Sequence, residues 1–339
     1  MTDLEGFKVA IIEPMDGCEE TYKCLEERGC ELILGPPVSQ FKNKYTEEEL
    51  IELCNDVDAI MAMTRDPITP DLLDTCSKLR IISKYGRGID HLPLDYAADK
   101  GILIANTPIS HSSTVAEFAF CLIIACMRKL PIYVNRVKSG KWRDPSVGGI
   151  ELKGKTIGII GFGAIGKALV NRLLGWEMEV LVSDPYVEKE DVEKANAKLV
   201  DLEELLSRSD VITLHLPLLP STKGMIGEKE IRMMKDGAFF VNTSRGALVD
   251  ENALIKALEN GKIAGAGLDV FTVEPLEMTN KLREMENVIC TPHESGTSKE
   301  SSYRISLQGT ENCIKALKGE IPDFVVNPSG VKKWKERFL

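Results

Sequence analysis

The stretch Thr156-Ile157-Gly158-Ile159-Ile160-Gly161-Phe162-Gly163-Ala164-Ile165-Gly166 decides the fold of the chain around it. Its first five residues are typical of a buried strand, and residues 165–174 repeat apolar side chains at helical spacing. Three glycines in the pattern G-x-G-x-x-G lie between them, and a further apolar run, 179–183, follows the helix. Strand, tight turn, helix and strand in this order predict a parallel βαβ unit.

The glycines of this turn have distinct expected roles. Gly161 permits the tight turn, Gly163 lets the backbone approach a pyrophosphate, and Gly166 lets the helix pack close to the strand. The helix N-terminus then faces the phosphates. Asp184 ends the next strand, eighteen residues after Gly166, where its carboxylate would accept hydrogen bonds from ribose hydroxyls and repel a 2′-phosphate. The motif therefore predicts binding of NAD in preference to NADP.

Outward from this motif, short apolar runs alternate with amphipathic stretches along all 339 residues. This alternation predicts an α/β protein with doubly wound parallel sheets and helices on both faces. Seams near 106–108 and 291–296 indicate a central domain inserted into a discontinuous one, and the basic tail 332–337 is expected to be merely solvated. The expected strands are 8–12, 59–61, 81–83, 102–105, 156–160, 179–183, 211–214, 238–242, 264–269 and 288–290, and the expected helices include 46–54, 114–128, 165–174, 202–207, 251–260 and 299–317.

The composition is that of a folded protein with an acidic surface. Hydrophobic residues make up 43% of the chain and charged residues 28%, which suffices for packed cores. The formal net charge of −10 disfavours nucleic acids and anionic membranes as partners. The longest apolar run, 118–127, would span about 15 Å as a helix, half of a bilayer core. The first residues do not resemble a signal peptide, and nine cysteines without a Cys-x-x-Cys pair indicate a reduced, cytoplasmic protein without a metal site.

Four charged or titratable residues follow apolar strands in the second half of the chain: Arg245, Asp269, Glu274 and His293. Doubly wound sheets bind ligands at the carboxyl ends of their strands, so these side chains are expected to converge beside the cofactor. A histidine can take the hydroxyl proton of a substrate as hydride leaves, and a neighbouring carboxylate stabilises the imidazolium. A guanidinium can hold a carboxylate with two donors. The set suits oxidation of a hydroxy acid.

With these residues in place, the sequence resembles the D-isomer-specific 2-hydroxyacid dehydrogenase family. The matching stretches span most of the chain in family order: 84–90, Thr114-Val115-Ala116-Glu117, 161–166, His215-Leu216-Pro217-Leu218, 242–246, 267–275 and 291–296. The resemblance implies two Rossmann-like domains with NAD bound in the cleft between them. The substrate domain would comprise 1–107 and 297–339 and be flavodoxin-like, and the NAD-binding domain would comprise 108–296.

The resemblance also implies residue roles and an assembly. Arg245, Glu274 and His293 would be the catalytic residues, and the backbone N–H groups of Tyr85, Gly86, Arg87 and Gly88 would bind the substrate carboxylate. The family is usually dimeric through the cofactor domain, which places 118–127 near a homodimer interface. The residues implied to bind NAD are Gly161, Gly163, Ala164, Ile165, Gly166, Asp184, His215, Pro217, Thr222, Thr243, Ser244, Asp269 and Thr114.

Three departures from the common family pattern bear on the substrate. Arg87 replaces a small or apolar residue, Glu294-Ser295 follows the histidine where small apolar residues are usual, and the stretch 61–66 lacks an Arg-Ser pair but offers Arg65. We hypothesise that Arg87, with Arg65, binds a second anionic group of a small di-anionic acid such as 3-phosphoglycerate. The alternative is that Arg87 points to solvent or pairs with Glu294.

Two rival functions share this fold. Formate dehydrogenases are homologous but have a glutamine in place of Glu274, so this residue argues against them. A corepressor-like module that senses NAD(H) without significant turnover would retain the three catalytic residues. Turnover of NADH with a 2-oxoacid would distinguish the enzyme from the module.

Overall fold

The computed structural model describes residues 2–40, 45–63 and 66–339. It divides into two compact units: unit 1 comprises Met1–His111 and Ser298–Leu339, and unit 2 comprises Ser112–Thr297. Unit 2 is therefore inserted into unit 1, and each unit is built on its own parallel sheet. The predicted fold class, two doubly wound parallel-sheet domains with one inserted into the other, is confirmed.

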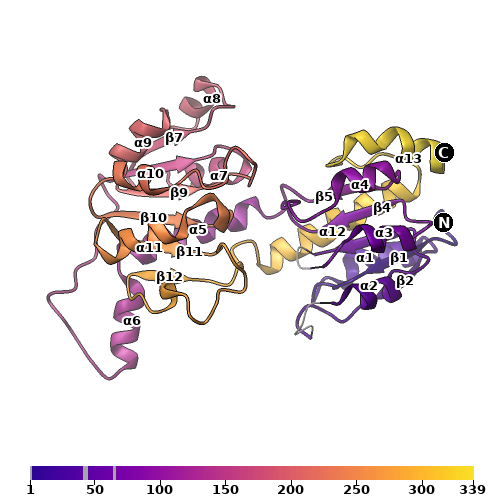
Figure 1. Cartoon of the computed structure of the whole chain (residues 1–339), viewed down its shortest axis with the longest axis horizontal. Helices are drawn as coiled ribbons and strands as arrows, with labels where there is room; N and C mark the ends of the chain where they lie inside the picture. The colour runs from indigo at the N-terminus through magenta and orange to yellow at the C-terminus, as the bar shows by residue number, and fades with distance from the viewer. Residues whose placement is uncertain (1, 41–44, 64–65) are drawn as a thin grey trace. The chain divides into compact units, whose positions relative to one another are not determined.

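Unit 1 has a five-stranded sheet in the order β2-β1-β3-β4-β5, with every pair parallel (Figure 1). Its strands are β1 (Lys8–Ile11), β2 (Glu31–Leu34), β3 (Ala59–Ala62), β4 (Ile81–Lys84) and β5 (Leu103–Asn106). Its helices are α1 (Glu19–Glu27), α2 (Glu47–Leu53), α3 (Pro70–Thr75), α4 (Leu94–Asp99), α12 (Lys299–Leu317) and α13 (Val331–Phe338).

Unit 2 has a seven-stranded parallel sheet in the order β12-β11-β10-β9-β6-β7-β8. The chain enters at β6 and leaves towards β7, then returns to the other side of β6 at β9, so the strand order reverses between β6 and β9. Its strands are β6 (Thr156–Ile160), β7 (Glu179–Ser183), β8 (Lys198–Leu199), β9 (Val211–Leu214), β10 (Ala238–Asn242), β11 (Ile263–Leu268) and β12 (Val288–Cys290). Its helices are α5 (Ser112–Met127), α6 (Leu130–Lys138), α7 (Ala164–Arg172), α8 (Lys189–Lys194), α9 (Leu202–Arg208), α10 (Glu228–Met233) and α11 (Glu251–Glu259).

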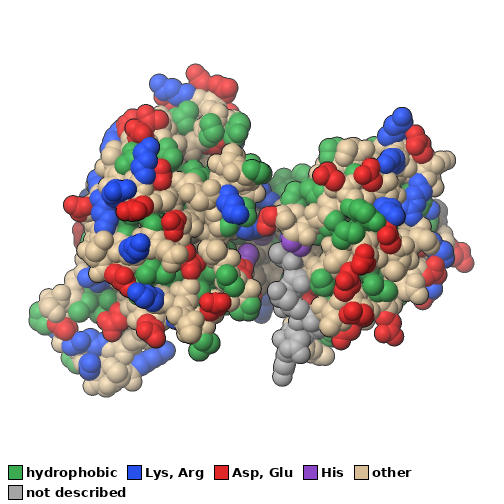
Figure 2. Space-filling model, in the orientation of Figure 1, with side chains coloured by type: hydrophobic (Ala, Val, Ile, Leu, Met, Phe, Trp, Pro, Cys, Tyr) green, Lys and Arg blue, Asp and Glu red, His purple; other side chains and the backbone are tan. Residues whose placement is uncertain are grey.

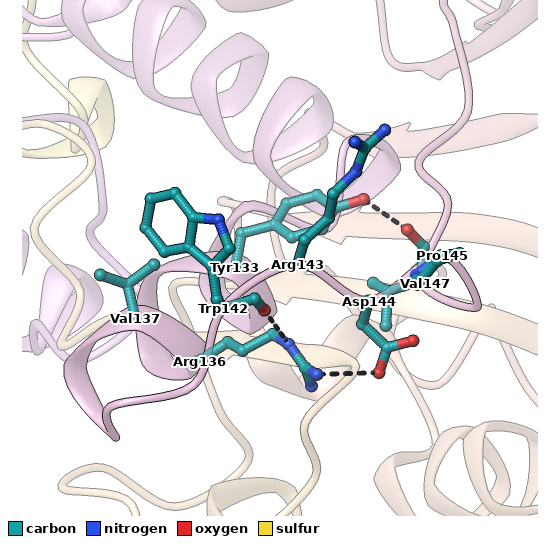
Figure 3. A pocket seen from close by; sticks show the side chains of 8 residues that line it. All are labelled: Tyr133, Arg136, Val137, Trp142, Arg143, Asp144, Pro145 and Val147. Carbon is teal, nitrogen blue, oxygen red and sulfur yellow. Dashed lines mark hydrogen bonds and ion pairs between the residues drawn. The ribbon is translucent and has the colours of Figure 1, made fainter.

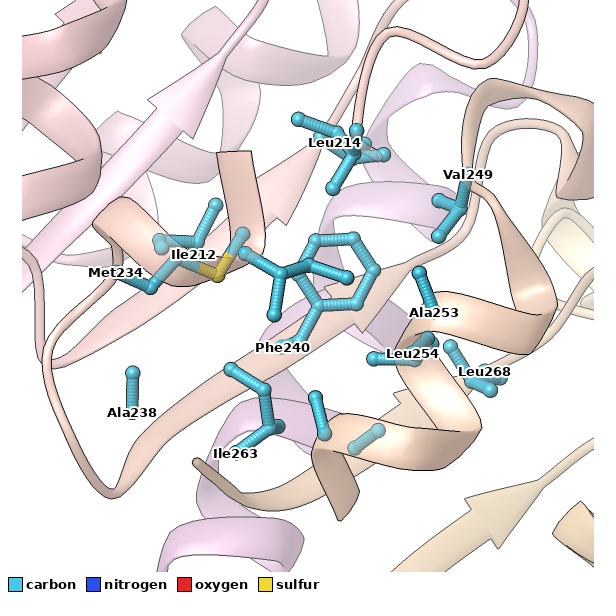
Figure 4. Packing of buried hydrophobic residues seen from close by; sticks show 14 of the residues in the cluster. Ile212, Leu214, Met234, Ala238, Phe240, Val249, Ala253, Leu254, Ile263 and Leu268 are labelled. Atoms are coloured by element: carbon cyan, nitrogen blue, oxygen red, sulfur yellow. The ribbon is translucent and has the colours of Figure 1, made fainter. Parts of the chain in front are cut away.

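The unit 2 sheet has a hydrophobic core on each face, because successive side chains of its strands point to opposite faces. In β10, Phe240 points into the cluster under α9, α10 and α11, shown in Figure 4, whereas Phe239 and Val241 point into the cluster under α5 and α7. This follows from the two-residue period of a strand. All five residues of β10 are buried, as expected for a strand covered on both faces.

The C-terminal tail is ordered, which corrects the expectation that it is merely solvated. Residues Val331–Phe338 form α13, and its Trp334 is fully buried in the core of unit 1. The guanidinium of Arg80 lies over the aromatic ring of Phe338 and also over the ring of Phe7. The pattern was missed because a single apolar turn among basic residues is a weak signal of helix burial.

We predict that Trp334→Ala destabilises unit 1 strongly. Removing a fully buried indole costs about 3–5 kcal/mol of unfolding free energy, and chemical denaturation followed by circular dichroism measures it. Lys335→Ala, on the exposed face of the same helix, is the matched control and should change the free energy by less than about 0.5 kcal/mol. Equal effects of the two substitutions would contradict the packing role of Trp334.

Among the helices of the described residues, none combines the length and the apolar character needed to cross a membrane. The apolar run 118–127 lies within α5, which places Leu122, Ile123 and Cys126 in the core of unit 2. The expected buried helix is therefore present.

Candidate active site

The carboxyl ends of the strands of unit 2 gather the polar residues of interest along one edge of the sheet. The glycine turn follows β6, His215 follows β9, the 243–245 turn follows β10, Asp269 follows β11, and Thr291 follows β12. All these strands are parallel neighbours, so their carboxyl ends meet at the same edge. The glycine turn leaves β6 at the point where the strand order reverses, which is where open α/β sheets bind ligands.

The glycine turn leaves no room for a side chain at positions 161 and 166. Gly161 has a φ of +99°, and a Cβ on it would lie 2.6 Å from the carbonyl oxygen of His215. A Cβ on Gly166 would lie 2.3 Å from the carbonyl oxygen of Gly161. Gly163 is the N-cap of α7, whose first residues are Ala164 and Ile165. The turn and the N–H groups at the start of the helix therefore form a cradle that would suit a phosphate group.

Asp184 is fastened to this cradle. One of its carboxylate oxygens accepts the N–H of Phe162 at 2.8 Å, and the other accepts the N–H of Tyr186 at 2.9 Å. The carboxylate is thus held beside the glycine turn by the backbone of both neighbouring loops. An acceptor in this place fits ribose hydroxyls and disfavours an added phosphate.

Two buried polar atoms beside the turn have no hydrogen-bond partner within the described chain: Nδ1 of His215 and Oγ1 of Thr243. The two residues follow Leu214 and Asn242, which are paired in the sheet, so they lie on adjacent strands. The other ring nitrogen of His215 lies 3.1 Å from Oγ1 of Thr213. Burial lowers the pKa of His215 to about 4. Unsatisfied buried groups of this kind fit a polar ligand such as a dinucleotide.

Other predicted cofactor residues bond within unit 2. The hydroxyl of Ser244 donates to the carbonyl of Leu214 at 2.6 Å, and the hydroxyl of Thr222 donates to that of Pro217 at 2.8 Å, closing the 217–222 turn. Thr114 lies in the first turn of α5. These contacts fix the backbone of the loops that carry these residues.

The three predicted catalytic residues all belong to unit 2. Oε2 of Glu274 lies 2.7 Å from Nδ1 of His293, and Oε1 accepts the N–H of Phe271 at 3.0 Å. Burial acts to raise the pKa of Glu274, but the hydrogen bonds of His293 and Phe271, with the charges of His293 and Arg245, outweigh it and leave this pKa below its ordinary value. An ionised carboxylate therefore orients the imidazole through its Nδ1.

Close packing holds the turn of Arg245 against the loop that carries Glu274. A Cβ on Gly246 would lie 2.0 Å from the carbonyl carbon of Phe271, so only glycine allows this approach. Nη1 of Arg245 donates to the carbonyl of Ser244 at 2.7 Å. The guanidinium is thereby steadied beside the pair of Glu274 and His293.

Sequence reasoning missed two residues of this region, Asn242 and Thr291. Asn242 ends β10 and is 1% exposed, and its side-chain amide donates to the carbonyl of Arg245 at 2.9 Å. The hydroxyl of Thr291 donates to the carboxylate of Asp269 at 2.6 Å. Each of the two is a polar residue at the end of an apolar strand or directly after it, and that position was the available sequence signal.

The predicted substrate loop, 85–88, lies in unit 1 directly after β4. The N–H of Tyr85 donates to the carbonyl of Ala62 at 2.8 Å, and that of Gly86 donates to Oγ1 of Thr107 at 2.7 Å. These two N–H groups are thus used within unit 1. Those of Arg87 and Gly88 make no hydrogen bond within the described residues and remain as donors. Arg65, the other predicted anion ligand, lies outside the described residues.

Comparison with known proteins agrees with this geometry. Residues 120–295 match the family model of the D-isomer specific 2-hydroxyacid dehydrogenase, NAD binding domain. The chain is 41% identical to a glyoxylate reductase of Thermococcus litoralis over 82% of this chain and 86% of that protein. It is 38% identical to a D-3-phosphoglycerate dehydrogenase of Methanocaldococcus jannaschii over 97% of this chain and 61% of that protein. It therefore spans about three fifths of the length of the latter.

A solved structure shows the same fold. A D-lactate dehydrogenase from Aquifex aeolicus, complexed with NAD and lactic acid, superposes with a TM-score of 0.80 at 30% identity, covering 94% of this chain and 99% of that one. The chain belongs to the D-isomer specific 2-hydroxyacid dehydrogenase family.

Proposed function

We propose that the protein is an NAD-dependent oxidoreductase that interconverts a D-2-hydroxy acid and its 2-oxoacid. The observation that carries the proposal is the 2.7 Å contact between Glu274 and His293, with the guanidinium of Arg245 close enough to affect the carboxylate. The glycine turn and Asp184 fit NAD. The relatives named glyoxylate reductase and D-3-phosphoglycerate dehydrogenase support the reaction class.

In this proposal each residue has one task. When bound, the oxidised cofactor NAD⁺ would supply the acceptor for the hydride that leaves C2 of the hydroxy acid, and NADH would supply the hydride donor in the reverse direction. His293 takes the hydroxyl proton at Nε2 and returns it to the oxygen in reduction. Glu274 stabilises the imidazolium through Nδ1, and Arg245 holds the substrate by its carboxylate or carbonyl oxygen.

A panel of 2-oxoacids tests the reaction. Loss of NADH absorbance on adding glyoxylate, hydroxypyruvate or a longer 2-oxoacid is the expected result. NADH binding without turnover on any member of the panel would contradict the enzyme and favour an NAD(H)-sensing binding module.

We further propose that Arg87 selects a substrate with a second anionic group, such as a phosphorylated 2-oxoacid. The side chain is exposed, and the carbonyl of Arg87 is held by the side-chain amide of Asn106 at 2.9 Å. The 85–88 loop thus combines one exposed cation, the side chain of Arg87, with the backbone N–H groups of Arg87 and Gly88.

Arg87→Ala should lower kcat/KM about 10-fold more for a phosphorylated 2-oxoacid than for glyoxylate, because a hydrogen bond to a charged group is worth roughly 1.5–3 kcal/mol. Steady-state kinetics on both substrates measures the ratio. Arg232→Ala, an exposed arginine on α10, is the control. An equal loss on the two substrates would show that Arg87 does not read the second anion.

We also propose that the protein forms a homodimer through an arm of unit 2, defined as residues 128–144. Its helix α6 has no buried residue, and the arm exposes Leu130, Tyr133, Val137 and Trp142, the last to 79%. An isolated nine-residue helix without a buried face is marginal in water, so a partner surface is required to cover it. In contrast to the apolar side chains of the arm, Leu122 and Ile123 of α5 are buried in the core of unit 2.

The partner that best fits this arm is a second copy of the chain. The arm carries six Lys or Arg residues and one Asp, whereas the whole chain has a net charge of −10, so its remainder is strongly acidic. Figure 2 shows blue side chains gathered in the lobe that contains the arm. Figure 3 shows Trp142 and Tyr133 beside Arg136, around a pocket with a volume of about 600 Å³. A basic, apolar arm fits an acidic surface with apolar residues.

Val137→Asp combined with Trp142→Asp should convert the dimer into a monomer, as measured by light scattering after size exclusion. Met278→Asp, at a residue that is also 79% exposed, introduces the same charge outside the arm and should leave the dimer intact. A wild-type protein that is monomeric at all concentrations would overturn the dimer, and an unchanged mass of the double variant would place the interface elsewhere.

A further inference from the structure

We infer that two buried residues, Asn242 and Asp269, act as one positioning unit that holds the turn of Arg245 and the loop of His293 in fixed relation. The inference rests on the proposed function, because it concerns how the residues of that reaction are placed. Neither residue is expected to react. Both are almost inaccessible, with 1% and 0% of their surface exposed.

Asp269 closes the loop that carries His293. Oδ1 accepts the hydroxyl of Thr291 at 2.6 Å and the N–H of Glu294 at 3.0 Å, and Oδ2 accepts the N–H of Ser295 at 2.8 Å. Thr291 and Glu294 flank Pro292 and His293, so the carboxylate ties both ends of the loop and leaves the imidazole at its tip. An ionised carboxylate has about four acceptor positions, and three of them are used here.

The loop needs this external support. His293 has a φ of +59°, in the left-handed region, which costs roughly 1–2 kcal/mol for a residue with a side chain. Within the loop, the backbone N–H of His293 donates a hydrogen bond to the carbonyl of Thr291, two residues earlier, at 3.1 Å. The strained conformation is therefore maintained by contacts from outside the loop, and Asp269 provides three of them.

Asn242 does the same for Arg245. Its side-chain amide donates to the carbonyl of Arg245 at 2.9 Å, and its Oδ1 accepts the N–H of Ser244 at 2.9 Å. The two supports are directly joined, because the N–H of Asp269 donates to the carbonyl of Asn242 at 3.0 Å. A continuous chain of hydrogen bonds thus runs from the backbone of Arg245 through Asn242 and Asp269 to the loop of His293.

The decisive experiment changes the least disruptive member of the chain. Thr291→Val removes one hydroxyl at nearly constant shape, and Thr291→Ser restores it. Amide hydrogen exchange of the peptide 288–297, measured by mass spectrometry on the full-length protein, should rise about 10-fold in Thr291→Val and in Asp269→Asn and stay near wild type in Thr291→Ser. Asn242→Ala should raise exchange at 243–247 in the same way.

Kinetics then separates positioning from binding. In Thr291→Val, kcat with the best 2-oxoacid should fall about 10-fold, as for supports of functional residues in other sites. Its KM for NADH and its melting temperature should stay near wild type, since the hydroxyl lies on the His293 loop and not in the glycine turn.

Matched controls come from the amino-terminal ends of strands in the same sheet. Asp210 accepts the N–H of Thr156 at 2.8 Å, and the amide of Asn287 donates to the carbonyl of Ala264 at 3.3 Å. Asp210→Asn and Asn287→Ala remove comparable contacts and should leave exchange of both loops unchanged.

Three results would overturn the inference: unchanged exchange of 288–297 in Thr291→Val, failure of Thr291→Ser to restore it, or an equal rise in Asp210→Asn. If the wild-type protein turns over no 2-oxoacid, the proposed function fails, whereas the exchange measurement still decides the positioning role.

Discussion

His293→Asn should abolish turnover while NADH still binds. Replacing a general acid–base catalyst typically costs about 10²–10⁴ in rate, and asparagine keeps a polar side chain of similar reach without a group that titrates near neutral pH. The expected result is a fall in kcat of about 1,000-fold with the best 2-oxoacid. Quenching of protein fluorescence by NADH, titrated on the same sample, measures whether the cofactor site survives.

Glu274→Gln is a second, separate variant to be compared with His293→Asn. The amide can still accept from the N–H of Phe271 and bond to the imidazole, but it cannot stabilise the imidazolium. We expect an intermediate loss in kcat and a pH–rate profile that differs from wild type. A His293→Asn variant with more than a tenth of wild-type kcat would show that another group transfers the proton.

Gly166→Ala should have the largest effect on cofactor binding. The added methyl would lie 2.3 Å from the carbonyl oxygen of Gly161, which is backbone and can move only if the turn opens. Overpacking of this kind costs about 1–3 kcal/mol of unfolding free energy, and displacement of the turn removes the cradle for the phosphates. We expect the dissociation constant for NADH to rise at least about 100-fold, as measured by fluorescence titration.

Gly227→Ala makes the same chemical change where there is room. A Cβ at this position meets the end of the Glu230 side chain at 3.4 Å and the carbonyl oxygen of Gly224 at 3.8 Å, both ordinary contacts, and the backbone of Gly227 is in the ordinary extended region. Losing glycine at a helix N-cap costs less than about 1 kcal/mol, so NADH affinity should be unchanged. Tight NADH binding by Gly166→Ala would contradict the assignment of the turn.

The arrangement of the sheets was predictable because it depends on runs of apolar residues. The strand 156–160 and its glycine turn are strong signals, since the strand is buried on both faces and positions 161 and 166 of the turn have no room for a Cβ. β2, Glu31–Leu34, was missed: it is an edge strand with no fully buried residue. β8, Lys198–Leu199, has two residues and leaves no periodicity to detect.

The candidate site shows a similar limit. Arg245, Glu274 and His293 were found because reactive side chains follow apolar strands, and the structure brings Glu274 and His293 within 2.7 Å of each other. The roles of Asn242 and Thr291 depend on which backbone groups their side chains reach, and this is fixed by the register of β10 and β11 and by loop conformation. Sequence spacing carries no such information.

The burial of His215 affects how the activity of the protein is expected to depend on pH. With a pKa of about 4, this imidazole stays uncharged across the physiological range, although it lies beside the glycine turn. The charge of this histidine, and its contribution to the electrostatic field at that end of the sheet, therefore do not change with pH across this range. We therefore expect a break in the activity profile between about pH 5 and 8, the range in which histidines ordinarily change charge, to come from a different group.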